Sequence, residues 1–94
     1  MSGDPNILRA ARLLLSISQE ELARLSGVST PSIKRIEGGD RRVLLSNVDA
    51  LKRVLEERGV VFLGATETMG PGFRVSLSLA DGWESGASRG VPKD

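Results

Sequence analysis

Residues 18–37 have the sequence SQEELARLSGVSTPSIKRIE, and this stretch decides the fold. Ser18 and the glutamate three residues later have the spacing of a capping box, which marks the start of a helix. Gly27 predicts the end of that helix, because glycine tolerates the positive φ found after a last helical turn. Ser29 and Pro31 predict a second start, with serine as the N-cap and proline in the first turn. The stretch therefore predicts two short helices joined by a tight turn.

The second of these helices, over residues 30–37, has an inward and an outward side. Ile33 and Ile36 are three residues apart, so they lie on one side and attach the helix to a core. The polar side chains that point outward are Thr30, Ser32, Lys34 and Arg35. Lysine and arginine donate hydrogen bonds to guanine, and threonine or a proline ring can contact a thymine methyl. These outward residues therefore predict that the helix inserts into a DNA groove.

The pattern resembles the helix-turn-helix of the Cro-like, or XRE-like, phage-repressor family over residues 6–63. The resemblance is carried by an S-Q-x-x-L-A opening, a G-V-S turn and a closing I-x-x-I-E-x-G: Ser18, Gln19, Leu22, Ala23, Gly27, Val28, Ser29, Ile33, Ile36, Glu37 and Gly39. It implies a sequence-specific transcriptional regulator, bacterial or phage, that binds double-stranded DNA. Repression is the commoner outcome in such a family, and a homodimer on a palindromic operator is the implied mode of binding.

The resemblance also implies roles for individual side chains. Base contacts are expected from Thr30, Pro31, Lys34 and Arg35, although family members often carry a hydrogen-bonding side chain where Pro31 stands. Contacts to the DNA backbone are expected from Gln19, Ser29, Ser32, Arg41 and Arg42. The alternatives without DNA contact are that Ser29 is only a helix cap, that Gln19 only begins a helix, and that Arg41 and Arg42 are only solvated. Arg12 and Glu37 match positions that form a structural ion pair between the first and third helices.

The rest of the chain predicts a mainly α fold: four helices that form the helix-turn-helix domain, followed by a C-terminal antiparallel β-hairpin. The helices are expected over residues 6–15, 19–25 and 30–37, and then from a cap at Ser46 to a stop at Gly59. The domain would cover residues 1–59, the hairpin 60–79, and a disordered, glycine- and serine-rich tail 80–94.

The hairpin is expected to be the dimer interface. Residues 60–63 (VVFL) form a short apolar run, which predicts a strand buried on both faces, and residues 73–79 (FRVSLSL) alternate with four apolar residues on one face. The four helices are expected to complete a core by themselves, so that one chain has too little apolar surface left to cover both strands. The interface residues would be Val60, Phe62, Phe73, Val75, Leu77 and Leu79.

Composition argues against other classes of function. The chain has 94 residues and a formal net charge of +1, with no cysteine and no histidine. Thiol and imidazole chemistry, disulfides and the usual zinc sites are therefore excluded, and no cofactor, metal or enzyme activity is expected. No apolar run approaches the roughly 18 residues of a membrane span, and no signal peptide is evident. A soluble cytoplasmic protein is expected.

A second hypothesis places the function in protein interaction. The helix-turn-helix would then be a scaffold, as in an antitoxin that binds a protein partner through its hairpin or through residues 80–94. Trp83, the one tryptophan of the chain, is expected to be exposed in that tail.

Overall fold

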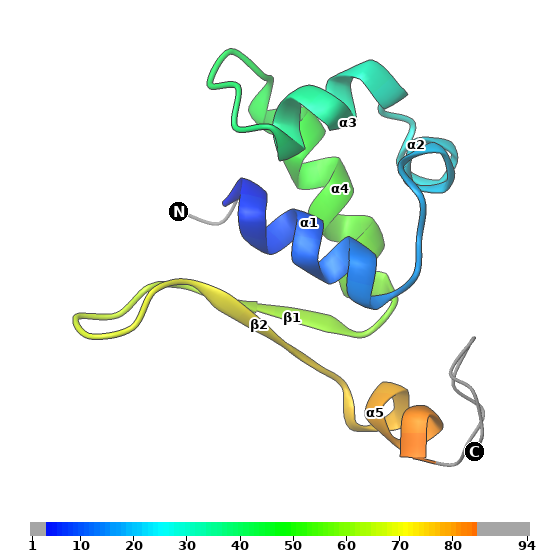
Figure 1. The fold of residues 1–94 in the computed structure, drawn as a ribbon, viewed down its shortest axis with the longest axis vertical. Helices are drawn as coiled ribbons and strands as arrows, with labels where there is room; N and C mark the ends of the chain where they lie inside the picture. The colour runs from blue at the N-terminus through cyan, green and yellow to red at the C-terminus, as the bar shows by residue number, and fades with distance from the viewer. Residues whose placement is uncertain (1–3, 85–94) are drawn as a thin grey trace.

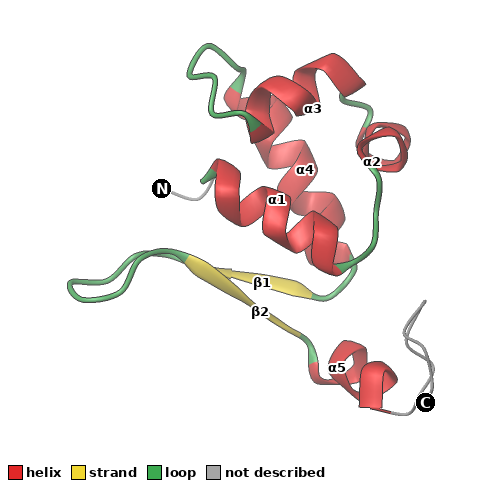
Figure 2. Ribbon diagram, in the orientation of Figure 1, coloured by secondary structure: helices red, strands yellow, loops and turns green. Residues whose placement is uncertain are grey.

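The computed structural model describes residues 4–84. Five helices and two strands follow one another in it: α1 (Pro5–Leu14), α2 (Gln19–Ser26), α3 (Thr30–Glu37), α4 (Leu45–Glu57), β1 (Val60–Leu63), β2 (Gly72–Val75) and α5 (Leu77–Glu84). Figures 1 and 2 show α1 to α4 grouped together, the sheet beneath α1, and α5 at the opposite end from α3. The predicted fold class, mainly α with an antiparallel hairpin after the helices, is confirmed.

Three of the helices begin at residues whose side chains accept hydrogen bonds from free backbone N–H groups. Asp4 Oδ1 accepts from the N–H of Asn6 at 2.9 Å, and Ser18 Oγ accepts from that of Glu21 at 2.9 Å. Ser29 Oγ accepts from the N–H of Ser32 at 3.2 Å. These caps satisfy donors that have no partner inside the helix, so the starts of α1, α2 and α3 follow from local sequence.

Two predicted details of the caps are wrong. The Glu21 carboxylate pairs with Arg24 one turn later rather than returning to the N–H of Ser18, so only half of the capping box forms among the described residues. The cap of α4 is Leu44 rather than Ser46, and Leu44 makes no side-chain capping bond. Packing therefore sets the start of α4, because its buried residues hold it without a capping side chain.

The hydrophobic core contains residues of α1, α2, α3, α4 and β1. Its buried members are Leu8, Ala11, Leu22, Val28, Ile33, Ile36, Val48, Leu51, Val54, Leu55 and Val60. Val60 is only 2% exposed, and Phe62 and Phe73 pack against the same cluster. The expectation that the four helices complete the core alone is therefore wrong, because the hairpin closes one side of it.

The two strands pair so that their inward and outward residues are clearly separated. Val60 lies opposite Val75 and Phe62 opposite Phe73, and the two phenylalanine rings meet edge to face with their centroids 6.5 Å apart. The intervening pairs, Val61 with Arg74 and Leu63 with Gly72, lie on the outer face. Val61 is 52% exposed and Leu63 is 45% exposed. The prediction of a strand buried on both faces is thus wrong for the single chain.

The second strand is shorter than predicted, because it ends at Val75 and the chain turns into α5. The N–H of Ser76 donates to the carbonyl of Gly59 at 2.7 Å, and Ser76 Oγ accepts from the N–H of Leu79 at 3.3 Å. Serine thus caps a helix at a point where the alternation alone suggests more strand. The prediction of a strand over residues 73–79 is wrong beyond Val75.

The tail prediction is also changed by α5. Residues 80–84 belong to this helix rather than to a disordered segment, and residues 85–94 lie outside the described part of the chain. Leu79, Ala80 and Trp83 have helical spacing and are half-buried. The expectation that Trp83 is exposed is therefore wrong.

Gly59 sits where α4 passes into β1, and its backbone explains why a glycine is needed. Its φ is +105°, a backbone conformation that residues with a side chain rarely adopt. A Cβ at this position would also lie 2.8 Å from Ser76 Oγ, which is held by its capping bond. This glycine therefore lets the end of α4, the hairpin and the start of α5 approach one another closely.

Candidate nucleic-acid interface

The turn between α2 and α3 directs one side of α3 away from the protein. Gly27 ends α2 with φ +79°, and its N–H donates to the carbonyl of Ala23 at 2.9 Å. Val28 in the turn is 5% exposed, while Ile33 is 0% and Ile36 is 2% exposed. Since these three side chains anchor the turn and α3 in the core, the opposite side of the helix faces solvent.

That outward side carries the residues expected to contact bases, and we call it the recognition face: Thr30, Pro31, Lys34 and Arg35. Pro31, Lys34 and Arg35 are exposed, and Thr30 is half-buried in the first turn. Lys34 makes no ion pair with any residue of the described chain. The recognition face therefore presents an ammonium and a guanidinium group beside an apolar proline ring.

Ser29, Ser32 and Arg35 form a chain of hydrogen bonds along the same helix. Ser29 Oγ donates to Ser32 Oγ at 3.0 Å, and the Arg35 guanidinium donates to Ser32 Oγ at 3.1 Å through Nη2. The sequence placed Ser32 and Arg35 on the outward side of the helix and Ser29 at its cap, but the contact between Ser32 and Arg35 was not predicted. Their spacing of three residues was the available signal, because such residues are neighbours on a helix.

The ends of α1, α2 and α3 are joined by a buried polar network. Arg12 donates to Glu37 through Nε at 2.6 Å and through Nη2 at 2.9 Å, and to the carbonyl of Ile17 at 2.8 Å. Gln19 Nε2 donates to the same carboxylate at 3.0 Å. The structure thus brings together the two residues of the predicted ion pair. It also adds Gln19, for which the sequence suggested a phosphate contact or a simple helix start but not a bond to Glu37.

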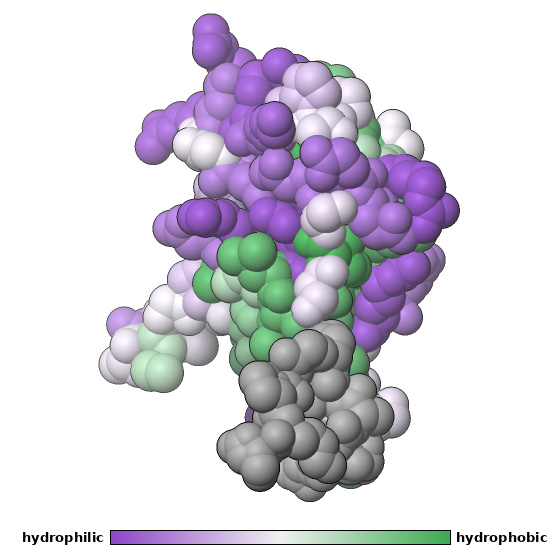
Figure 3. All heavy atoms as spheres, turned by 45° about the vertical axis from the view of Figure 1, so that its right-hand side comes forward, coloured by the Kyte–Doolittle hydropathy of each residue, from purple (hydrophilic) through white to green (hydrophobic). Residues whose placement is uncertain are grey.

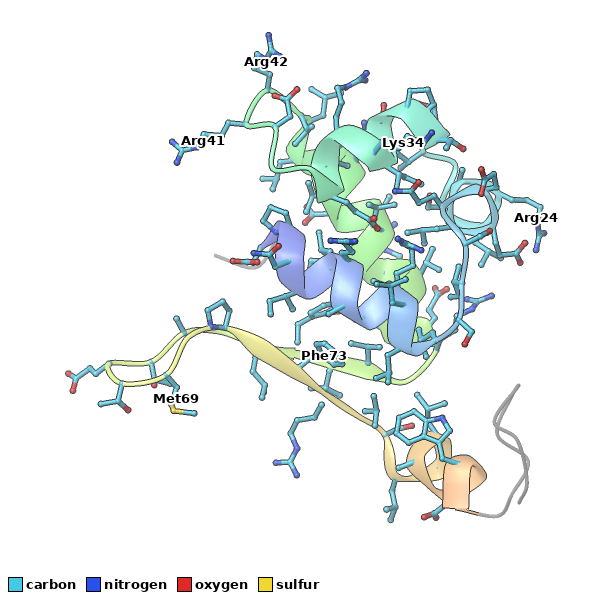
Figure 4. The ribbon with its side chains drawn as sticks, viewed as in Figure 1. Arg24, Lys34, Arg41, Arg42, Met69 and Phe73 are labelled. Atoms are coloured by element: carbon cyan, nitrogen blue, oxygen red, sulfur yellow. The ribbon has the colours of Figure 1, made fainter. Side chains whose placement is uncertain are left out.

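The two arginines in the loop after α3, Arg41 and Arg42, differ in their ion pairing. Arg42 bonds Asp40 through Nε at 3.2 Å and Nη2 at 3.3 Å, and its backbone N–H donates to the same carboxylate at 2.9 Å. These bonds to Arg42 hold the pKa of Asp40 below its usual value and raise the pKa of Arg42. Arg41 is exposed and has no ion-pair partner within residues 4–84. Figure 4 shows both arginines projecting from the loop away from the helices.

Charge near the recognition face is consequently positive. Arg12 and Gln19 occupy the carboxylate of Glu37, and Arg42 occupies that of Asp40. On α3 and in the loop after it, Lys34, Arg35 and Arg41 form no ion pair with any residue of the described range 4–84, and all three are exposed. The hydrophilic surface in Figure 3 covers the half of the molecule that carries α2 and α3. Exposed cations along α3 and the loop after it attract a polyanion although the formal net charge is only +1.

The residues expected at the dimer interface are divided between two environments. Val60 belongs to the core, and Phe62 and Phe73 face it, as Figure 4 shows for Phe73. Val75 and Leu79 are half-buried, the latter beside Gly59. Leu77 is 75% exposed. The inner-face residues are therefore occupied within one chain, which leaves Leu77 as the accessible member of the set.

Other classes of site find no geometric support in the part of the chain described. Within residues 4–84, no three carboxylate, imidazole or thiol side chains gather closely enough to hold a metal ion. In the same range no helix combines the length and the apolar character needed to span a bilayer.

A helix-turn-helix family model matches residues 8–60, which is more than half of the chain and includes α2, α3 and α4 completely. A comparison with curated proteins finds no match. The matched segment begins within α1 and ends at the first residue of β1, so the family segment is the helical core described above. On this evidence the chain belongs to the XRE-type helix-turn-helix family of DNA-binding transcription regulators.

Proposed function

We propose that the protein is a sequence-specific repressor that inserts the recognition face of α3 into the major groove. The observation that carries this proposal is the exposure of Lys34 and Arg35 on the side of α3 opposite Ile33 and Ile36. Both side chains can donate to guanine O6 and N7, and Arg35 can do so with two bonds. Pro31 and Thr30 offer apolar contact with thymine methyl groups.

Contacts to phosphate would fix the position of the helix on the duplex. Arg41 is the strongest candidate, because it is exposed, lies just beyond α3 and is not neutralised within the described residues. Arg42 stands beside it with a charge that Asp40 partly offsets. Ser29, Ser32 and Gln19 lie at helix starts, where N–H groups favour an anion. Such contacts add affinity on every sequence, whereas the recognition face selects among sequences.

We also propose that the protein acts as a homodimer through the outer side of the hairpin and α5. Among the described residues, four of the seven large apolar side chains that are exposed lie on the hairpin and α5, namely Val61, Leu63, Met69 and Leu77; the others are Leu13, Leu44 and Leu45. Figure 3 shows apolar surface beginning below the hydrophilic half of the molecule. A two-fold mate would cover such residues with their own copies. It would present two recognition helices to successive major grooves about 34 Å apart, and the operator would be palindromic.

Selection of bound duplexes from a library with a randomised core tests the proposal. We expect an enriched palindrome whose half-sites contain guanine, and we expect light scattering to give twice the mass of one chain. Failure to enrich any sequence would contradict sequence-specific regulation.

The alternative function in protein interaction rests on the same exposed apolar residues. It predicts a chain that is monomeric alone, binds no preferred DNA sequence, and forms a complex only with a second protein. The light-scattering and selection experiments therefore separate the two functions.

A further inference from the structure

One hydroxyl group on α3 receives two hydrogen bonds at once. Ser29 Oγ donates to Ser32 Oγ at 3.0 Å, and Arg35 Nη2 donates to the same atom at 3.1 Å. A serine hydroxyl has two acceptor positions and one proton. Both acceptor positions of Ser32 are thus filled, and only its proton remains to be donated, which suits an anionic oxygen outside the helix.

The hydroxyl orients Arg35 without removing its charge. A carboxylate partner would hold a guanidinium equally well but would neutralise it. The Asp40 carboxylate interacts with the Arg35 charge at a distance, but its hydrogen bonds come from Arg42, through three N–H groups. Arg35 donates one N–H to Ser32, which leaves four of the five guanidinium N–H groups for a ligand.

Orientation matters because a free arginine side chain samples many rotamers. Those rotamers must be lost when the guanidinium forms two parallel bonds to a guanine. A side chain already held in one direction loses less freedom on binding, and therefore binds its matched base more tightly. Ser32 lies one turn before Arg35 and is itself held by Ser29, the cap of α3. The hydrogen bonds thus run from Ser29 at the start of the helix through Ser32 to the guanidinium of Arg35.

We propose that Ser32 is a positioning residue that sets the specificity of Arg35 for guanine. This inference rests on the proposed function, since it requires Arg35 to contact a base. It assigns Ser32 to base selection through Arg35, in addition to the phosphate contact that its remaining proton allows.

The test compares Ser32→Ala with wild type as full-length chains. The probes are the duplex selected from the randomised library and its variants with one guanine replaced. The substitution leaves the cap intact, because Ser29 Oγ accepts from the backbone N–H of residue 32. We expect discrimination at the position read by Arg35 to fall about three- to tenfold, the loss typical of one intramolecular hydrogen bond. Discrimination at the other positions should stay unchanged.

Two control variants separate positioning from other effects. Ser32→Thr keeps the hydroxyl and should restore discrimination, and Ser78→Ala makes the same deletion on an exposed position of α5. A double-mutant cycle completes the design. In the Arg35→Ala background, Ser32→Ala should have no further effect on discrimination, because the group that it orients is gone.

Each result has a clear meaning. A position-specific loss that disappears in the Arg35→Ala background supports the proposal. Unchanged discrimination in Ser32→Ala, alongside a clear loss in Arg35→Ala, overturns the positioning role and leaves base contact by Arg35 standing. Unchanged discrimination in Arg35→Ala overturns both. A uniform loss on all duplexes in Ser32→Ala also overturns the positioning role, because a phosphate contact alone has that effect.

Discussion

Arg12 on α1 and Glu37 at the end of α3 form a two-point ion pair, with Nε–Oε2 at 2.6 Å and Nη2–Oε1 at 2.9 Å. The two side chains are only 9% and 5% exposed. Arg12 Nη1 donates to the carbonyl of Ile17, and Gln19 Nε2 adds a second hydrogen bond to Oε1 of Glu37, so both charged groups are hydrogen-bonded beyond the ion pair itself. This contact ties the helix that carries the recognition face to the start of the chain.

Replacement of Arg12 by alanine should destabilise the fold strongly. It would leave the Glu37 carboxylate buried with only Gln19 as a partner, and breaking such a buried pair typically costs about 3–5 kcal/mol. Urea unfolding of Arg12→Ala and Arg9→Ala checks this, because Arg9 is an exposed arginine on the same helix. Equal midpoints for the two variants would show that the ion pair contributes nothing to stability.

Lys34→Ala and Arg35→Ala should each weaken binding to the selected operator by about 1–3 kcal/mol, if each side chain contacts a base. The loss should be concentrated at particular base pairs, since base-edge contacts carry sequence information. Mobility shifts on the operator and its single-base variants measure it. Arg53→Ala, an equal change of charge at an exposed position of α4, serves as the control. Wild-type binding by both variants would mean that the recognition face lies elsewhere.

Arg41→Ala should reduce affinity on all sequences alike. Removal of one phosphate contact lowers the slope of log K against log salt concentration by about one. The expectation follows from the exposure of Arg41 and from its lack of an ion-pair partner in residues 4–84. Binding titrations at several salt concentrations decide it. A lost base preference with an unchanged slope would instead assign Arg41 to base contact.

The pKa of Asp40 should lie below its usual value of 3.8, because its hydrogen bonds from Arg42 favour the charged carboxylate. A depressed folded-state pKa contributes stability above the unfolded value, and that contribution disappears as the pH falls through the folded-state pKa. Carboxyl NMR titration should show the lowered pKa in wild type and a return toward the usual value in Arg42→Gln. The same pKa in both proteins would show that the ion pair does not persist in solution.

Leu77→Asp should convert the proposed dimer into a folded monomer with much weaker operator binding. Leu77 is 75% exposed, so a charge there costs the single chain little but would be unpaired in an apolar interface. Ser78→Asp adds the same charge at the neighbouring exposed position and should remain dimeric if the contact is specific. Light scattering distinguishes the outcomes, and a dimeric Leu77→Asp would move the interface to another surface.

Much of the helical domain could be predicted because its signals are local. The bounds of α3 agree with the prediction, α2 ends one residue later than predicted, and α1 begins and ends one residue earlier. Caps such as Ser18 and Ser29, and the left-handed glycine at position 27, act within one turn of the backbone. The sequence also placed Lys34 and Arg35 on the outward side, since the helical period and the two anchoring isoleucines suffice for that.

The second half of the hairpin could not be predicted in the same way. Leu77 and Leu79 continue the alternation of residues 73–75, and that pattern indicates a longer strand than the one that forms. The choice depends on Ser76, whose N–H bonds the distant carbonyl of Gly59 and whose hydroxyl caps α5. The sequence also did not show that α1 to α4 need the hairpin to complete their core. That need depends on the space that Val60 fills once the helices have packed.

The sequence by itself determined the helix-turn-helix, its starts and stops, and the side of α3 that faces outward. Hydrogen bonds and side-chain neighbours within a few residues set these features. Only the tertiary structure decided that Gln19 joins the Arg12–Glu37 pair, that the hairpin closes the core, and that the chain turns at Ser76. These features depend on residues far apart in the chain, and their proximity exists only once the helices have packed.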